Sequence, residues 1–198
     1  MKYFLISLCI AACGKSSPPA AAPAAPAEPP VVEQPPAPPE PPPPPAPKAA
    51  KVELAPTTKS KSKVKGTISF KEVDGGVEIT AEIEGLKPRQ QHAWHIHETG
   101  DCSAPDATSA GAHFNPENHA HGGPEADQRH AGDFGNLTAD KAGKATATVT
   151  MKGITIAEGP TSIVGKGFII HAKKDDLKTQ PTGNAGDRIA CGVIAVEE

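Results

Sequence analysis

The sequence predicts an all-β domain built from antiparallel strands. Residues 77–83 alternate between apolar and polar side chains, which is the pattern of a strand with one buried face. The turn Asp74-Gly75-Gly76 separates this segment from a second strand pattern at 67–70, and so short a turn joins strands that run antiparallel. No stretch keeps helical periodicity over three turns, so helices are not expected to form the core.

Composition confines the folded domain to residues 50–198. Of the 23 prolines among the 198 residues, 17 lie before residue 57. The remaining length, about 150 residues, is a common size for a single hydrophobic core. Aromatic residues make up only 4% of the chain, so the core depends on Val, Ile, Leu and Ala. Such a core is expected to need cross-links, such as disulfides or bound metals, in addition to the burial of apolar side chains.

Residues 1–12 read as an export signal of the bacterial lipoprotein type. The apolar run at 3–12 is far shorter than the roughly 20 residues of a membrane-spanning helix. Ile10-Ala11-Ala12-Cys13 resembles the lipoprotein box, in which cleavage precedes the cysteine and its sulfur receives lipid. Gly14 favours the outer membrane, so we expect an exported protein that is periplasmic or anchored to the outer membrane. The alternative is an ordinary secretory signal cut at small residues.

Residues 13–49 are a predicted tether rich in proline and alanine. Proline fixes its own backbone angle and donates no hydrogen bond, so the segment should be an extended, polyproline-like spacer. At about 3.1 Å per residue, such a spacer reaches on the order of 100 Å. A ligand for a proline-recognising partner is the alternative interpretation.

Strand patterns continue in order through the domain. The first strand is expected at 51–54, and later strands are expected at 93–98, 133–138, 145–151, 167–171 and 189–196. Two long connections remain, at about 99–131 and 172–188. Loops of that length in a compact domain are usually functional, so the site should be sought there.

Charge is informative locally rather than over the whole chain. The net charge of −3 gives no reason to expect a nucleic-acid partner. Alternating lysines precede the strand at 67–70 and indicate a solvated face or a protected sheet edge: Lys59, Lys61, Lys63 and Lys65. Attraction to a membrane or a polyanion is the alternative role for these lysines.

The histidines are arranged as metal ligands would be. His95 and His97 point to the same side of a strand, because residues i and i+2 share a face. Neutral imidazole is a good ligand for copper or zinc, although two strand histidines alone are weak evidence. More side chains of ligand type follow along the chain: His113, His121, His130, Asp133 and His171.

These motifs resemble the copper/zinc superoxide dismutase family, in its bacterial exported form, over about residues 50–198. The matching motifs are His95-Ile96-His97-Glu98, Gly100-Asp101-Cys102, Ser109-Ala110-Gly111-Ala112-His113-Phe114-Asn115-Pro116, His121-Gly122-Gly123-Pro124, Arg129-His130-Ala131-Gly132-Asp133 and Gly183-Asn184-Ala185-Gly186-Asp187-Arg188-Ile189-Ala190-Cys191-Gly192. The resemblance implies an eight-stranded antiparallel Greek-key β-barrel or sandwich with two long functional loops.

The resemblance also implies two metal sites that share His113. The implied copper ligands are His95, His97, His113 and His171. The implied zinc ligands are His113, His121, His130 and Asp133. Zinc would then be four-coordinate and closed, whereas copper would keep a position open to substrate.

Residues around these ligands are given supporting roles. Asp175 matches an aspartate that links a copper ligand to a zinc ligand, with Asp176 as the alternative if the register shifts by one. His92 is expected in a supporting or core role. His119 is expected to be exposed to solvent.

The implied activity is dismutation of superoxide to dioxygen and hydrogen peroxide by a copper redox cycle in which His113 passes on a proton. Arg188 matches the arginine that attracts and orients the superoxide anion; pairing with a carboxylate is its alternative role. A copper-binding or copper-buffering lipoprotein without turnover is the alternative function. A homodimer is left open, because family members differ in assembly.

Two further features follow from the comparison of motifs. Cys102 and Cys191 match the family disulfide, which closes about 89 residues, is worth about 4 kcal/mol and fits an oxidising compartment; two buried thiols are the alternative. The connection before Arg188 is shorter than in eukaryotic members, and Pro181 stands where their lysine would be. The candidates to replace that lysine's charge are Lys173, Lys174 and Lys178.

Overall fold

The computed structural model describes residues 49–197, and these residues form an antiparallel β fold. One 3₁₀ turn, η1 (Thr108–Ala110), lies in the connection after β4. The strands are β1 (Ala49–Pro56), β2 (Lys65–Val73), β3 (Gly76–Glu84), β4 (Gln91–His97), β5 (Asp133–Thr138), β6 (Ala145–Met151), β7 (Gly167–His171), β8 (Arg188–Val193) and β9 (Ala195–Val196).

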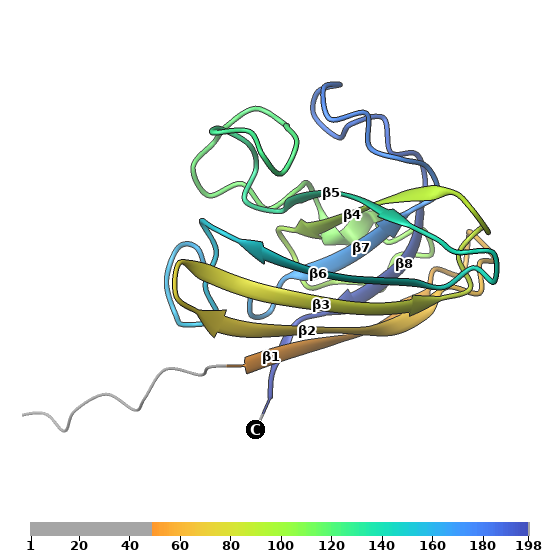
Figure 1. Cartoon of the computed structure of the whole chain (residues 1–198), viewed down its shortest axis with the longest axis horizontal. Helices are drawn as coiled ribbons and strands as arrows, with labels where there is room; N and C mark the ends of the chain where they lie inside the picture. The colour runs from red at the N-terminus through yellow and green to blue at the C-terminus, as the bar shows by residue number, and fades with distance from the viewer. Residues whose placement is uncertain (1–48, 198) are drawn as a thin grey trace, which may run out of the picture. The chain divides into compact units, whose positions relative to one another are not determined.

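The strands form a nearly closed barrel with Greek-key connections. Their spatial order is β5-β4-β7-β8-β1-β2-β3-β6, and β9 pairs with β1 (Figure 1). One half of the barrel holds β4, β5, β7 and β8, and the other holds β1, β2, β3 and β6. Between β1 and β8 the chain therefore crosses from half to half three times, after β3, β5 and β6. β1 joins the halves, because residues 49–54 pair with β2 and residues 55–56 pair with β8.

Strand formation follows the alternation of side chains in the sequence. In β3, Val77, Ile79, Ala81 and Ile83 are buried, while the residues between them are partly or fully exposed. The β2–β3 register is continuous from Lys65–Glu84 to Val73–Gly76, as the predicted Asp-Gly-Gly turn requires. Glycine suits this turn, since Gly75 has a φ of 87°.

Aromatic residues pack at the centre of the core. The Trp94 ring lies 5.6 Å from that of Phe134 and 6.0 Å from that of Phe168, and all three side chains are buried. The Trp94 indole N–H donates to the carbonyl oxygen of Phe134 at 2.9 Å, so its one polar atom is satisfied. Trp94, Phe134 and Phe168 thus form an aromatic cluster beneath the strands that carry the candidate ligands.

Several details differ from the sequence prediction. The last predicted strand, 189–196, is divided at Ile194 into β8 and β9. Of the four alternating lysines, Lys59, Lys61 and Lys63 lie in the β1–β2 loop and only Lys65 lies in a strand, although all four are exposed. A third long connection, 152–166, follows β6 and is held to the barrel by Glu72, whose Oε1 accepts from the Thr155 hydroxyl at 2.6 Å.

The predicted signal segment, the tether and Cys13 lie outside the described residues. Within residues 49–197, no helix is long and apolar enough to cross a membrane.

Candidate metal centre

The candidate ligands lie on the outer face of the β4–β7 pair, beneath the long connections. Trp94 and Ile96 of β4 point into the core, so His95 and His97 point to the opposite face. Both faces of β4 and β7 are nevertheless buried, because the 98–132 and 172–187 connections cover the outer one. Figure 1 shows parts of both connections projecting on the same side of the barrel.

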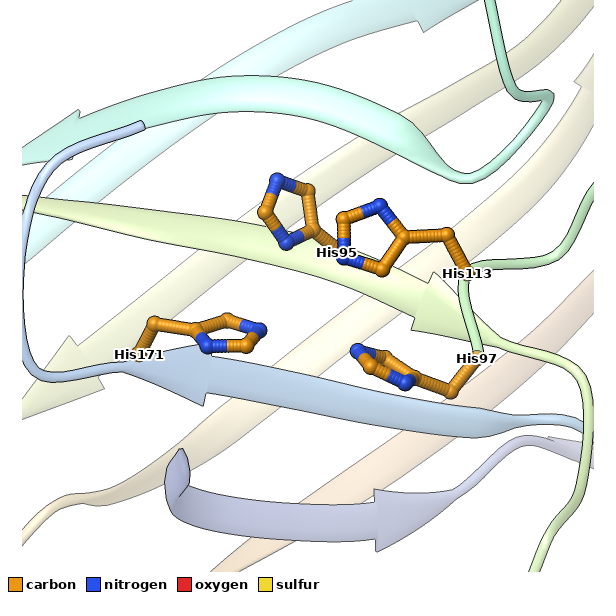
Figure 2. Close-up of side chains that lie close together, drawn as sticks. All are labelled: His95, His97, His113 and His171. Carbon is orange, nitrogen blue, oxygen red and sulfur yellow. The ribbon is translucent and has the colours of Figure 1, made fainter. Parts of the chain in front are cut away.

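Four imidazoles gather at this face. His95 and His97 come from β4, His171 comes from the end of β7, and His113 is brought to β4 by a bridge with His97 (Figure 2). The β7–β8 register shifts between Ile170 and His171, and such an irregularity can re-aim the following side chain. One nitrogen from each ring lies within 4.8 Å of those of the other three.

Each of these rings is held by its other nitrogen. The Nε2–H of His95 donates to Asp175 at 2.8 Å, and the Nδ1–H of His97 donates to the carbonyl oxygen of Gly111 at 2.9 Å. The Nδ1–H of His171 donates to the carbonyl oxygen of Gly186 at 3.2 Å. The remaining nitrogens are buried without a hydrogen-bond partner: His95 Nδ1, His97 Nε2, His113 Nε2 and His171 Nε2.

Buried polar atoms rarely lack a partner, so four together require an explanation. An imidazole bound to a metal through one nitrogen normally donates its other N–H to an oxygen, which is the pattern of His95, His97 and His171. An all-imidazole donor set suits copper. The residues present therefore fit a copper ion.

A second cluster shares His113 and consists of His113, His121, His130 and Asp133. The Nδ1 atoms of His113 and His130 lie 2.7 and 3.3 Å from Asp133 Oδ1, and 3.4 Å from each other. His121 Nδ1 lies 3.0 Å from Asp133 Oδ2 but makes no hydrogen bond. Three imidazoles and one carboxylate, all buried, form the kind of closed four-ligand set that structural zinc sites use.

Asp133 is held in place by the backbone. Its Oδ2 accepts from the amides of Gly122 and His130, both at 3.1 Å. Burial alone would raise the pKa of Asp133, but hydrogen bonds with the surrounding histidines lower it well below its usual range. The carboxylate therefore stays charged, as a metal ligand must be.

Asp175 connects the two clusters. Its Oδ2 accepts from His95 Nε2 at 2.8 Å and its Oδ1 accepts from His121 Nε2 at 2.9 Å. The alternative residue, Asp176, instead accepts from the backbone N–H groups of Lys178 and Thr179 within its own loop. The structure thus gives Asp175, and not Asp176, the linking position.

Burial keeps the imidazoles of the first cluster neutral. Burial is the largest cause that lowers the pKa values of His95, His97 and His171, and it lowers the pKa of His113 to about 4. Burial opposes protonation of His121 as well. There the carboxylates of Asp133 and Asp175 outweigh it and raise the pKa to about 9 in the metal-free chain.

Arg188 lies at the start of β8, next to the first cluster. It pairs with His171 in the β7–β8 register, and its Nη1 and Nη2 donate to the carbonyl oxygens of Ala107 and Gly111 at 2.6 and 2.7 Å. Its partners are carbonyls, and no carboxylate within residues 49–197 forms an ion pair with it. Partial burial lowers the pKa of Arg188, but a guanidinium remains charged at any physiological pH.

The connection that holds Arg188 is itself tied to β8. Cys102 and Cys191 form a disulfide with a Cα–Cα distance of 5.9 Å, which joins the 98–132 connection to the last long strand. Cys191, Ala107, Ala110 and Ile169 pack together in a small core of their own. The carbonyl oxygens that orient Arg188 therefore belong to a segment that the disulfide and this small core hold against β8.

The two histidines outside the clusters have different environments. His92 is buried, and its Nδ1 donates to the carbonyl oxygen of His171 at 2.8 Å, which fits the predicted core role. His119 was expected to be exposed, but its side chain is only 26% exposed. It is covered because it lies beside Glu117 and its Nδ1 contacts the carbonyl oxygen of Arg129 at 3.3 Å.

Sequence reasoning missed three residues near the site. Asn136 and Gln180 each pair their side-chain amide with the backbone of one residue, Asp175 and His121 respectively. Lys59 lines a cavity of about 380 Å³ together with Arg188, whereas its sequence context predicted a solvated face or sheet edge, or a membrane or polyanion contact. No local pattern could reveal these contacts, because each joins segments far apart in the chain.

Comparisons with known proteins agree with this geometry. The family model described as copper/zinc superoxide dismutase matches residues 64–194. The chain is 46% identical to "Superoxide dismutase [Cu-Zn]" of Paramecium bursaria Chlorella virus 1 over 137 residues, which is 66% of this chain and 72% of the viral protein. It is 41% identical to "Extracellular superoxide dismutase [Cu-Zn]" of Drosophila melanogaster over 152 residues, 73% of this chain and 82% of that protein.

A solved structure agrees as well. The chain resembles the crystal structure of the clock protein EA4 with a TM-score of 0.69 and 37% sequence identity, covering 77% of this chain and 96% of the other. The family match extends over more than half of the chain and over all the candidate ligands. The chain therefore belongs to the copper/zinc superoxide dismutase family.

Proposed function

We propose that this protein dismutates superoxide to dioxygen and hydrogen peroxide. The observation that carries the proposal is the meeting of four buried imidazole nitrogens, all without a hydrogen-bond partner, next to the fixed guanidinium of Arg188. The curated relatives in the chlorella virus and in the fly are named as copper/zinc superoxide dismutases, which supports the same activity here.

The proposed copper ligands are buried imidazole nitrogens that lack a hydrogen-bond partner. The proposed zinc ligands are Asp133 and the imidazoles around it. Copper would be held by His95 Nδ1, His97 Nε2, His113 Nε2 and His171 Nε2. Zinc would be held by the second cluster: His113, His121, His130 and Asp133. When bound, copper supplies one-electron redox chemistry, which converts two superoxide ions and two protons into dioxygen and hydrogen peroxide.

Arg188 would bind the substrate. Two of its five N–H donors are used by the carbonyl oxygens of Ala107 and Gly111, which leaves three free for a small anion. Because these two hydrogen bonds already fix the guanidinium, little side-chain freedom is lost when superoxide binds. Arg188 would thereby attract the anion and orient it through charge-assisted hydrogen bonds.

His113 would handle a proton. Its Nε2 faces the first cluster without a partner, while its Nδ1 faces Asp133 in the second. Because the Nδ1 side stays fixed, Nε2 can take up a proton and give it to the reduced substrate without movement of the ring. Burial, which lowers the pKa of His113, favours the return of that proton.

A superoxide assay on the domain loaded with copper and zinc tests the proposal. Turnover well above that of the same concentration of free copper is expected, together with one copper and one zinc per chain by metal analysis. Tight copper binding without turnover would instead favour the copper-buffering alternative. Weaker binding of both metals by His113→Ala, but not by the exposed-loop variant Lys63→Ala, would support the shared ligand.

We also propose that the protein is exported and attached to the envelope by lipid on Cys13. The Cys102–Cys191 disulfide supports an oxidising compartment, and the fly relative is named as extracellular. Cell fractionation with labelled fatty acid tests attachment: the wild type should be labelled in the membrane fraction, and Cys13→Ser should be unlabelled. Label retained by Cys13→Ser would contradict the proposal.

A further inference from the structure

Gln180, an exposed residue of the β7–β8 connection, forms two hydrogen bonds with the backbone of His121, one as acceptor and one as donor. Its Oε1 accepts from the His121 amide at 2.7 Å, and its Nε2 donates to the His121 carbonyl oxygen at 2.9 Å. The two residues are 59 positions apart in the chain. No other hydrogen bond reaches the backbone N–H or C=O of His121 within residues 49–197.

His121 is therefore held by two side chains. Gln180 fixes its backbone and Asp175 accepts from its Nε2, which leaves its Nδ1 facing the second cluster beside Asp133. Both Gln180 and Asp175 come from the β7–β8 connection. This connection, rather than the one that carries His121, determines where the His121 ring points.

The same connection covers His121 from outside. Leu177 contacts Gly123, with 3.4 Å from its Cδ1 to the position that a Cβ of Gly123 would occupy. Gly183 lies so close to Asp175 and His121 that a Cβ there would collide with both side chains. Gly183 also has a φ of 64°, a conformation that glycine adopts without strain.

Gln180 is presented by a turn that is already formed. Asp176 Oδ1 accepts from the amides of Lys178 and Thr179 at 3.0 and 2.8 Å, and its Oδ2 accepts from the Thr179 hydroxyl at 2.6 Å. The amide of Gly183 then closes the turn by donating to the Thr179 carbonyl oxygen at 2.7 Å. Because the turn is fixed by hydrogen bonds of its own, it directs the Gln180 side-chain amide at His121.

We propose that Gln180 is a positioning residue for the zinc ligand His121, and that its two hydrogen bonds slow the loss of zinc. This inference rests on the proposed zinc cluster. Groups that orient a ligand typically change metal affinity by about 10- to 100-fold when they are removed. Gln180 is exposed, so water can replace its bonds and the barrel should fold without it.

Zinc release from the purified domain to a chelator at neutral pH tests the inference. Gln180→Ala should release zinc about tenfold faster than the wild type. Gln90→Ala is the matched control, because Gln90 is exposed and its side chain makes no hydrogen bond within residues 49–197. With Co²⁺ in place of zinc, Gln180→Ala should also shift the visible absorption bands, which report ligand geometry and not fold stability.

A second variant keeps one of the two bonds. Gln180→Glu retains an acceptor for the His121 amide but has no donor for its carbonyl oxygen, so its zinc release should also exceed that of the wild type. Release at the wild-type rate from both Gln180 variants, or equally fast release from Gln90→Ala, would overturn the inference. Absence of zinc from the wild type at this cluster would instead overturn the zinc assignment itself.

Discussion

Arg188 and His97 donate to the same acceptor, the carbonyl oxygen of Gly111, at 2.7 and 2.9 Å. The guanidinium proposed to bind substrate and a proposed copper ligand therefore share one hydrogen-bond acceptor. Arg188→Ala should lower kcat/KM by about 10- to 100-fold, because the attraction and orientation of the anion are lost. Copper content should be unchanged, since the His97 bond to Gly111 does not need Arg188.

Arg89→Ala is the control for this variant, because Arg89 is exposed and lies in the β3–β4 turn. Superoxide turnover and copper content, measured on the same samples, decide the outcome. An Arg188→Ala protein as active as Arg89→Ala would remove Arg188 from the mechanism. Copper loss from Arg188→Ala would assign it a structural role instead.

Lys59 should assist Arg188 through charge. It forms an ion pair with Asp106 at 3.0 Å, and both residues line the cavity that Arg188 also lines. Lys59→Ala removes the ion-pair partner of Asp106 and one positive charge from this cavity, so kcat/KM at low ionic strength should fall about twofold. At high salt the difference should disappear, and a defect of equal size at both salt concentrations would contradict the electrostatic role. Lys63→Ala, exposed in the same loop, serves as control.

The disulfide should contribute strongly to stability. It closes a separation of 89 residues, for which the chain-entropy model gives roughly 4 to 5 kcal/mol. Cys102→Ser combined with Cys191→Ser should therefore lower the free energy of unfolding by about 4 kcal/mol, measured by denaturant titration of the metal-free domain. A decrease below about 1 kcal/mol would show that the packing of the 98–132 connection suffices without the bond.

Stability of the metal-free domain should fall as the pH decreases from 6.5 to 4. The folded-state pKa of His113 is lowered to about 4, and those of His95, His97 and His171 are lowered too. The folded protein thus binds fewer protons than the unfolded chain in this window, so acid favours unfolding. His121 acts at higher pH: its raised pKa stabilises the fold below 6.5, and this contribution is lost as pH rises through about 9.

Denaturant midpoints of the metal-free domain, measured between pH 4 and 9, check this dependence. A maximum near neutral pH is expected. His113→Gln should flatten the acid side of the curve while leaving the alkaline side unchanged. A curve for the wild type that rises toward pH 4 would contradict the proposed protonation states.

The strands could be predicted where one face meets the core and the other meets solvent. Such alternation placed β6 at its observed bounds, 145–151. The bounds expected for β5 and β7 also match, although both faces of β7 are buried. The division of 189–196 was missed because Val193, Ile194 and Ala195 keep the exposed–buried–exposed alternation of a strand, and only the backbone reveals the break at Ile194. The 152–166 connection was missed for a similar reason: its buried Ile154, Ile156 and Ile163 resemble a strand in composition.

The candidate site was predictable as a set of residue types but not as an arrangement. Histidine and aspartate motifs indicated which side chains could bind metal, since ligand chemistry depends on residue type. The hydrogen bonds that aim them depend on backbone carbonyls and amides, such as those of Gly111, Gly186 and His121, which every residue possesses. The role of Gln180 could not be predicted from the sequence, because it depends on where the 98–132 connection places the backbone of His121.

β1 is hydrogen-bonded along both edges, to β2 on one side and to β9 and β8 on the other. A pull on the chain that precedes residue 49 would act along this strand and load many hydrogen bonds at once in shear, instead of unzipping them singly. Resistance to such force is set by the unfolding rate under load. The proposed ligands belong to other strands and connections, so a mechanical pull on the predicted tether would leave the metal centre outside the strand that bears the load.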